Sequence, residues 1–275
     1  MRPALAALLA CGALAARAGP EPVRREWTVG GQVREALVYA PAAGPRPPVV
    51  FVWHGHGGDM RSAAASFGIH RLWPEAVVVY AQGLPTAGRV TDRQGRRAGW
   101  QFHPGEQEDR DLKLFDAILA TLKSELHVDE ARVYATGHSN GGRFTQVLWA
   151  ARGAALAAVA PSGTRGDGLL HHLPPKPCLH LAGERDPLVP FAAQQATMEA
   201  VRTLNGCAAR GEPWARGAGF TATLYRSARG TPLVTVVHPG GHRFPEWAPE
   251  LIVRFLIEQG GATAHPLEPP PTRRE

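Results

Sequence analysis

The chain has 275 residues, of which 44% are hydrophobic and 20% charged. This composition is enough to build the core of one α/β domain and excludes a globally disordered protein. The formal net charge of +6 comes almost wholly from arginine, and the arginines are scattered rather than grouped in blocks. That pattern is typical of an ordinary solvated surface and argues against a nucleic-acid partner.

Residues 1–18 are predicted to be a secretory signal peptide. Arg2 precedes an apolar run, and Ala16-Arg17-Ala18 has the small-x-small pattern of a cleavage site. The run is too short to cross a bilayer, so no transmembrane segment is expected. An alternative treats LLAC as a lipid-attachment motif with Cys11 acylated, but the apolar stretch before Cys11 is short for that role. We expect a secreted protein, extracellular or periplasmic, cleaved near Ala18.

Short β-branched runs then alternate with longer helical patterns. The predicted strands are 34–41, 47–55, 75–83, 131–137, 156–163, 177–186 and 232–241, and the predicted helices are 111–126, 139–149, 191–206 and 245–261. This alternation predicts an α/β fold with a mostly parallel central sheet and helices on both of its faces. The predicted catalytic domain covers residues 19–260. Residues 261–275 are rich in proline and are expected to be a disordered tail.

Ser139 is the predicted nucleophile. It lies in the sequence GHSNG, directly after a predicted strand and at the start of a predicted helix. Gly137 and Gly141 lack the side chains that would obstruct a sharp strand-to-helix turn. Such a turn raises the serine hydroxyl above the carboxyl edge of the sheet, where ligands bind in parallel α/β folds. The alternative is an ordinary Gly-Ser turn.

A nucleophilic serine needs a histidine base, and that histidine needs a carboxylate. His242 follows the last predicted strand and is flanked by glycines, whereas His238 at the strand edge is the competing histidine. Asp186 follows another strand and lies between serine and histidine in the chain, which is the order of α/β-hydrolases. Asp167 and Glu184 are weaker acid candidates. His180, inside an apolar strand, is expected to be a core residue.

The glycine-rich stretch FVWHGHGGDM is predicted to supply the oxyanion hole. The amide of His56 or Gly57 would give one donor, and the amide of Asn140, next to the nucleophile, the other. A zinc site on His54 and His56 is the rival interpretation. No Cys, Glu or further His accompanies this pair at ligand spacing, so no metal is predicted.

Substrate contacts are predicted in two places. Trp100 and Gln101 lie in the long loop after strand 75–83, and His138 adjoins the nucleophile. Phe102 and His103 follow in the same loop and are also expected to border the substrate. Alternatively, Trp100 only packs that loop against the core.

Seven short motifs carry a family resemblance: HGHGGD, QGLPT, GWQ, VDEARVYATGHSNGG, LAGERDPLVP, LNGC and HPGGHRFP. They are similar to those of the polyhydroxybutyrate depolymerase and feruloyl esterase-like group of the α/β-hydrolases. The resemblance implies that Ser139, Asp186 and His242 form the triad and that HGHGG is the oxyanion loop. It also implies a secreted serine esterase without a cofactor, acting on plant cell-wall esters or polyesters.

The cysteines depart from that family. Cys178 and Cys207 are compatible with one disulfide or with free thiols. In relatives the cysteine of NGC is usually paired with one shortly before the last strand, but the stretch GFTATLYRSARGTPLV contains none. Cys178 is therefore the only potential partner for Cys207.

The favoured function is that of an esterase acting on soluble or oligomeric esters. Two other functions are alternatives to it. The first is a serine peptidase of the same fold, because a triad also cleaves amides. The second is a catalytically inactive secreted module that binds a polymer. An intact Ser139, Asp186 and His242 argue against the second, and the lack of a propeller or cap argues against the first.

Overall fold

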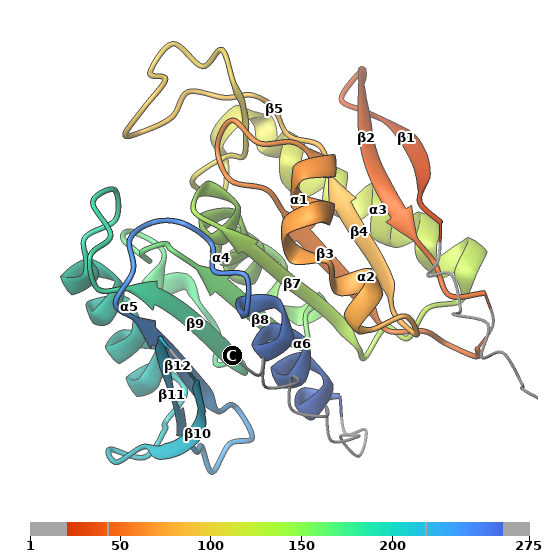
Figure 1. The fold of residues 1–275 in the computed structure, drawn as a ribbon. Helices are drawn as coiled ribbons and strands as arrows, with labels where there is room; N and C mark the ends of the chain where they lie inside the picture. Colours follow the sequence, from red (N-terminus) through yellow and green to blue (C-terminus); the bar gives the residue numbers. More distant parts are fainter. Residues whose placement is uncertain (1–20, 43, 218, 261–275) are drawn as a thin grey trace, which may run out of the picture.

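The computed structural model describes residues 21–260 except 43 and 218. The predicted signal peptide and the predicted proline-rich tail lie outside the described residues. A single sheet of ten strands runs through the molecule, in the order β1-β2-β4-β3-β7-β8-β9-β12-β11-β10 (Figure 1). Its strands are β1 Val23–Val29, β2 Gln32–Tyr39, β3 Val49–Trp53, β4 Val77–Ala81, β7 Val133–His138, β8 Ala158–Ser162, β9 Cys178–Gly183, β10 Glu212–Gly217, β11 Phe220–Tyr225 and β12 Leu233–His238.

The centre of the sheet is parallel and its edges are antiparallel. The six neighbours from β4 to β12 pair in parallel. The β1–β2 ribbon joins β4 antiparallel on one side, and the β10–β11 hairpin joins β12 antiparallel on the other. The prediction of a mostly parallel sheet is confirmed. Because parallel strands share a direction, the loops that follow them gather at one rim.

Helices cover both faces of the sheet, as the alternating pattern predicted. The helices α1 (Met60–Phe67), α2 (Ile69–Leu72) and α6 (Ala248–Gln259) pack on one face (Figure 1). On the other face lie α3 (Arg110–Leu126), α4 (Asn140–Arg152) and α5 (Phe191–Leu204). The remaining elements are the short strands β5 (Leu84–Pro85) and β6 (Ala98–Gly99) and the 3₁₀ turns η1 (Glu106–Asp109), η2 (Gly153–Ala155) and η3 (Leu170–His172).

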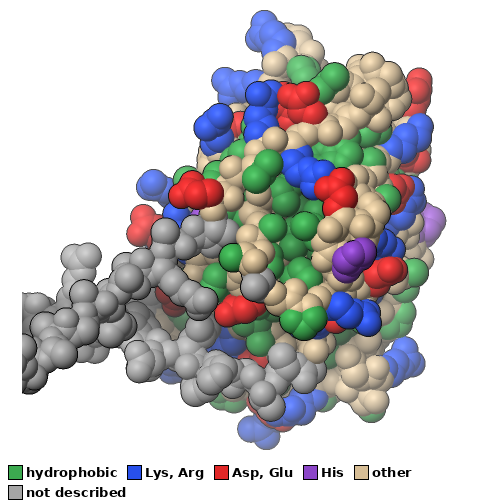
Figure 2. All heavy atoms as spheres, turned by 90° about the vertical axis from the view of Figure 1, so that its right-hand side faces the viewer, with side chains coloured by type: hydrophobic (Ala, Val, Ile, Leu, Met, Phe, Trp, Pro, Cys, Tyr) green, Lys and Arg blue, Asp and Glu red, His purple; other side chains and the backbone are tan. Residues whose placement is uncertain are grey.

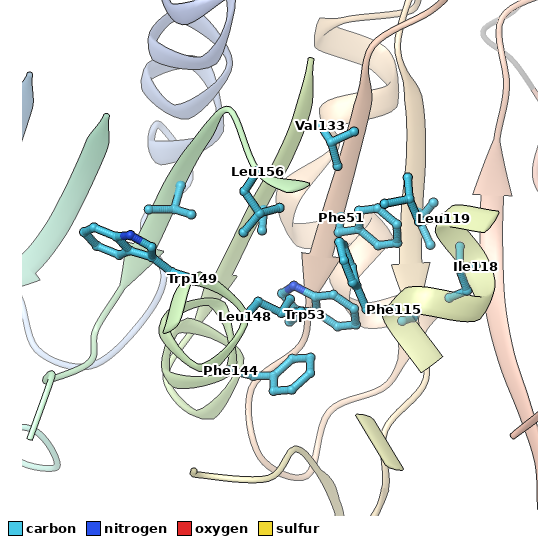
Figure 3. Packing of buried hydrophobic residues seen from close by; sticks show 14 of the residues in the cluster. Phe51, Trp53, Phe115, Ile118, Leu119, Val133, Phe144, Leu148, Trp149 and Leu156 are labelled. Atoms are coloured by element: carbon cyan, nitrogen blue, oxygen red, sulfur yellow. The ribbon is translucent and has the colours of Figure 1, made fainter. Parts of the chain in front are cut away.

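Aromatic side chains fill the core under α3 and α4. Trp53 on β3 packs edge-on against Phe144 of α4, with ring centroids 4.8 Å apart (Figure 3). Phe51, two residues earlier on the same face of the strand, contacts Phe115 of α3 at 4.7 Å. Burial of such large rings anchors both helices to the strand that leads into the predicted oxyanion loop.

Apart from the elements of two to four residues, β1, α1 and the two strands of the β10–β11 hairpin had no counterpart in the sequence prediction. The edge strand β10 is largely exposed and shows no strict alternation of buried and exposed residues, so its pattern resembles a loop. Helix α1 is only eight residues long and depends on a capping box between Asp59 and Ser62. Edge pairing determines β10 and a local cap determines α1, and neither has a long periodic run of apolar residues.

Cys178 and Cys207 are free thiols in the structure. Burial is the main factor that raises the pKa of each thiol, which keeps both protonated near neutral pH.

Figure 2 shows basic and acidic side chains interspersed on the face at the right-hand side of Figure 1. Among the helices of the described part of the chain, none is sufficiently long and apolar to cross a membrane.

Candidate active site

Ser139 sits at a strained turn between β7 and α4. Its backbone angles are φ 57° and ψ −119°, a left-handed conformation that a residue with a side chain rarely adopts. The turn is tight because α4 begins against the end of β3. A Cβ atom at Gly141 would clash with the Trp53 carbonyl and lie 2.6 Å from that of His54. Only glycine therefore allows this approach.

The serine hydroxyl meets an imidazole from the other end of the chain. His242, in the loop between β12 and α6, has its Nε2 atom 2.7 Å from Ser139 Oγ. Its Nδ1 atom lies 2.7 Å from Asp186 Oδ2, in the loop after β9. The structure thus brings together the three residues that the sequence singles out, in the hydrogen-bond order serine, histidine, carboxylate.

The Asp186 carboxylate is fixed by its own loop. The amides of Leu188 and Val189 donate to Oδ1 at 2.8 and 2.9 Å, and Gln194 of α5 donates to Oδ2 at 3.2 Å. Burial alone would raise the pKa of Asp186, but the hydrogen bonds from His242 and the two amides outweigh it and leave the pKa lowered. The carboxylate is therefore ionised beside the imidazole at neutral pH.

The competing residues lie elsewhere. The His238 ring is buried, and its Nδ1 accepts a hydrogen bond from the Gly240 amide at 3.1 Å. Asp167 pairs with Arg165 at 2.8 Å. Glu184 is exposed on the surface.

Two backbone amides are placed to receive a developing oxyanion. The Asn140 amide is at the first position of α4, where a helix has no internal acceptor for it. In the described part of the chain no acceptor is bonded to the His56 amide. The prediction for Gly57 is wrong, because its amide donates to the Ala98 carbonyl at 2.7 Å. Loop pairing across β6, which sequence spacing does not reveal, occupies that amide.

The two histidines of the rival metal site have protein partners instead. His54 Nε2 accepts from the Gly83 amide at 2.9 Å, and His56 Nε2 lies 3.2 Å from Asp92. Among the described residues, no group of three or more His, Cys, Asp or Glu side chains is arranged to hold a metal ion. These histidines brace the loops around the site.

A pocket of about 160 Å³ opens beside Ser139. Its walls are mostly apolar, with a few polar groups, as is usual for small-molecule sites. The lining includes Val90, Phe102, Arg143, Leu188 and Val189. Val90 and Leu188 are 61% and 43% exposed, so apolar side chains lie at the mouth of the pocket. Val90 belongs to the long loop between β5 and β6, which rises above the sheet in Figure 1.

The predicted substrate contacts are corrected by this pocket. Trp100 and Gln101 are fully buried and do not line it. Trp100 donates from its indole to the His54 carbonyl at 2.8 Å, so the alternative of a loop packed against the core holds. Gln101 donates to the carbonyl of His103 at 2.9 Å. His138 also lies outside the pocket lining, with its ring bonded to Ser162 and to the loop of His242.

Sequence reasoning missed Arg143, which does line the pocket. It lies four residues after Ser139 on α4, and this spacing places two helical residues on the same face. This spacing of four residues is the sequence signal that could have identified Arg143. Of the four loop residues that were expected to border the substrate, Phe102 does line the pocket.

Known proteins similar to this chain include esterases. A probable feruloyl esterase C of Aspergillus flavus is 29% identical over 199 residues, which cover 70% of this chain and 69% of that protein. The crystal structure of a thermostable esterase matches with a TM-score of 0.55 at 20% identity, over 67% of this chain and 52% of the other. An acetyl xylan esterase from Aspergillus awamori matches with a TM-score of 0.60 at 14% identity, over 87% and 99%. No protein-family model matches the sequence.

The sheet order, the helices on both faces and these structural matches show the α/β-hydrolase fold. Feruloyl esterases are among the sequence relatives of this chain.

Proposed function

We propose that this protein is a carboxylic-ester hydrolase that acts through Ser139, His242 and Asp186 as a catalytic triad with an acyl-enzyme intermediate. The observation that carries the proposal is the pair of 2.7 Å contacts from the His242 ring to Ser139 Oγ and to Asp186 Oδ2. A serine hydroxyl is a weak nucleophile by itself, and this arrangement supplies the base that activates it.

In the first step Ser139 Oγ attacks the ester carbonyl carbon while His242 Nε2 takes the hydroxyl proton. Asp186 holds the Nδ1–H tautomer and stabilises the imidazolium. The carbonyl oxygen becomes an oxyanion that accepts hydrogen bonds from the Asn140 and His56 amides. The intermediate collapses, His242 returns the proton to the departing alcohol, and Ser139 remains acylated.

In the second step His242 takes a proton from water, and the resulting hydroxide attacks the acyl carbon. Collapse breaks the bond to Ser139 Oγ, which recovers the proton from His242. The carboxylic acid leaves and the triad is restored. The positive end of the α4 dipole supports the negative charge in both tetrahedral intermediates.

The favoured substrates are feruloyl and acetyl esters, since similar proteins are named for them. Hydroxybutyrate oligomers are the alternative that the motif resemblance suggests. We further propose that the protein is secreted after removal of residues 1–18. A panel of feruloyl, acetyl-xylan, 4-nitrophenyl and hydroxybutyrate-oligomer esters identifies the substrate class.

Ser139→Ala tests the triad. We expect kcat to fall on the order of 10⁶-fold, by analogy with other triads. A fluorophosphonate probe should label the wild type at Ser139 and leave the variant unlabelled. Ser66→Ala, an exposed serine on α1, is the matched control. A kcat reduced less than tenfold in Ser139→Ala would refute the triad.

The same experiments separate the competing functions. A wild type that resists the probe and hydrolyses no ester would be an inactive binding module. A peptidase would cleave acylated peptide anilides faster than the matching esters, although esters are intrinsically more reactive.

A further inference from the structure

Arg143 places a cationic group in the pocket beside the nucleophile. It lies one helical turn after Ser139 on α4, lines the pocket and is only 7% exposed. A charge removed from water in this way is costly unless a partner of opposite charge compensates it.

The partners of Arg143 are backbone carbonyls rather than carboxylates. Nε donates to the Phe102 oxygen at 2.9 Å, Nη1 to the Arg165 oxygen at 3.1 Å and Nη2 to the Asp167 oxygen at 2.8 Å. The His103 ring nitrogens lie 3.3 and 3.4 Å from Nη2. Within residues 21–260 apart from 43 and 218, no carboxylate forms a salt bridge with this guanidinium.

Another buried arginine of this chain, Arg34, has its charge compensated by a carboxylate. Arg34 is 1% exposed, and its guanidinium pairs with the buried Asp111 at 2.8 Å. Arg34 is not among the residues that line the pocket, whereas Arg143 is. Arg34 therefore has a carboxylate partner, whereas Arg143 has none among the described residues.

The other cations of the pocket wall are already compensated. Arg89 pairs with Glu106 at 3.0 Å, and Arg165 pairs with Asp167 at 2.8 Å. Burial, and then the nearby Arg143, lowers the pKa of His103, so this ring is neutral near pH 7. Arg143 is therefore the arginine of the pocket wall that has no salt bridge to a carboxylate in the described part of the chain.

We propose that the pocket binds esters that carry a carboxylate, which Arg143 receives while Ser139 attacks the ester carbonyl. The inference rests on the proposed function and narrows its substrate class. A guanidinium has five N–H donors, and the three carbonyls leave at least one on Nη1 without a protein acceptor. A charge-assisted bond to a carboxylate would use it. Val90, Phe102 and Leu188 would hold the carbon chain between the two polar ends.

The carboxylate can belong to either half of the ester, so the test has two arms. For the acyl half, mono-4-nitrophenyl glutarate is compared with the neutral 4-nitrophenyl hexanoate. For the alcohol half, 4-carboxyphenyl acetate is compared with its methyl ester. Each arm yields a ratio of kcat/KM, anionic over neutral, corrected for the uncatalysed rates. In the wild type we expect at least one ratio above one.

Arg143→Gln should lower that ratio about tenfold or more, since hydrogen bonds to charged groups are among the stronger ones. Using a ratio within one variant cancels any general loss of activity. Arg152→Gln removes the same charge from the same helix, at a residue bonded to Asp116 outside the pocket, and should keep the wild-type ratio.

A ratio unchanged in both arms of Arg143→Gln would overturn the proposal and leave Arg143 as a brace between two loops. If that variant does not fold, wild-type ratios below one in both arms overturn it equally. Absence of hydrolysis of all four esters would instead count against the proposed function. The two failures are thereby distinguishable.

Discussion

The His138 ring bonds to the main chain of His242, with Nε2 2.7 Å from the carbonyl oxygen. Since a carbonyl only accepts, Nε2 carries the proton and Nδ1 accepts from the Ser162 hydroxyl at 3.0 Å. Burial, and then the neighbouring His242, lowers the pKa of His138 to about 4, so the ring is neutral near pH 7. A residue next to the nucleophile thus holds the loop that presents the imidazole.

His138→Leu should therefore lower kcat about tenfold, the effect of losing one buried hydrogen bond that positions a reacting group. KM should change less than kcat, because His138 does not line the pocket. His138→Gln keeps a side-chain donor and should lose less. Steady-state kinetics on 4-nitrophenyl acetate, with thermal melting as the folding check, measures both. A wild-type kcat in His138→Leu would show that the loop holds its position without this bond.

Asp186→Asn should reduce kcat about 10⁴-fold, because an amide at this position favours the wrong imidazole tautomer. The variant should still fold, since the asparagine oxygen can accept from the Leu188 and Val189 amides that now reach Asp186. The rate of fluorophosphonate labelling should fall in parallel. Glu184→Gln, at the exposed acid nearby, is the control. A loss below tenfold in Asp186→Asn would remove Asp186 from the mechanism.

The parts of the site that sequence could predict are those fixed by local chain geometry. Ser139, Asp186 and His242 each follow a short, mostly apolar strand, and residues after parallel strands gather at one rim. What sequence could not predict depends on how loops fold back. The Gly57 amide donates to the Ala98 carbonyl instead of facing the site. Trp100 is buried because it packs against α4, where it stacks on Phe144 and its amide donates to the Asn140 side chain.

The long helices and the central strands were predictable for the same reason, since each long helix has apolar residues at helical spacing and each central strand is a continuous, mostly apolar run. The β10–β11 hairpin depends on pairing with β12 and has neither pattern. Arg143 was predictable in position, by its interval of four from Ser139, but the absence of a carboxylate beside it emerges only in three dimensions.

Gly141→Ala should destabilise the fold by about 3 kcal/mol or more, because overpacking against rigid backbone cannot be relieved by a rotamer change. The added methyl group would meet the carbonyls of Trp53 and His54, so β3 and α4 would have to separate. Urea unfolding measures the loss. Gly55→Ala is the stability control, since its Cβ would lie 3.5 Å or more from its neighbours, at ordinary contact distance. Equal stability of the two variants would contradict the close approach at Gly141.

His180 gives the protein a specific sensitivity to acid. It lies on β9, is 1% exposed, and neither ring nitrogen has a partner with good hydrogen-bond geometry in the described part of the chain. Burial lowers its pKa to about 4. The unfolded chain binds this proton near pH 6.5 and the folded chain does not. Stability from this site is therefore complete above pH 6.5 and is lost as the pH falls toward 4.

His180→Leu removes that linkage. Between pH 7 and pH 4 the wild type should lose about 3 kcal/mol more unfolding free energy than the variant, the cost of a pKa difference of this size. At pH 7 the variant should be at least as stable, because it also removes two buried ring nitrogens without partners. Urea titrations at both pH values measure this. His171→Leu on the surface should keep the wild-type difference, and an equal difference in His180→Leu would mean that the buried ring does not cause the acid sensitivity.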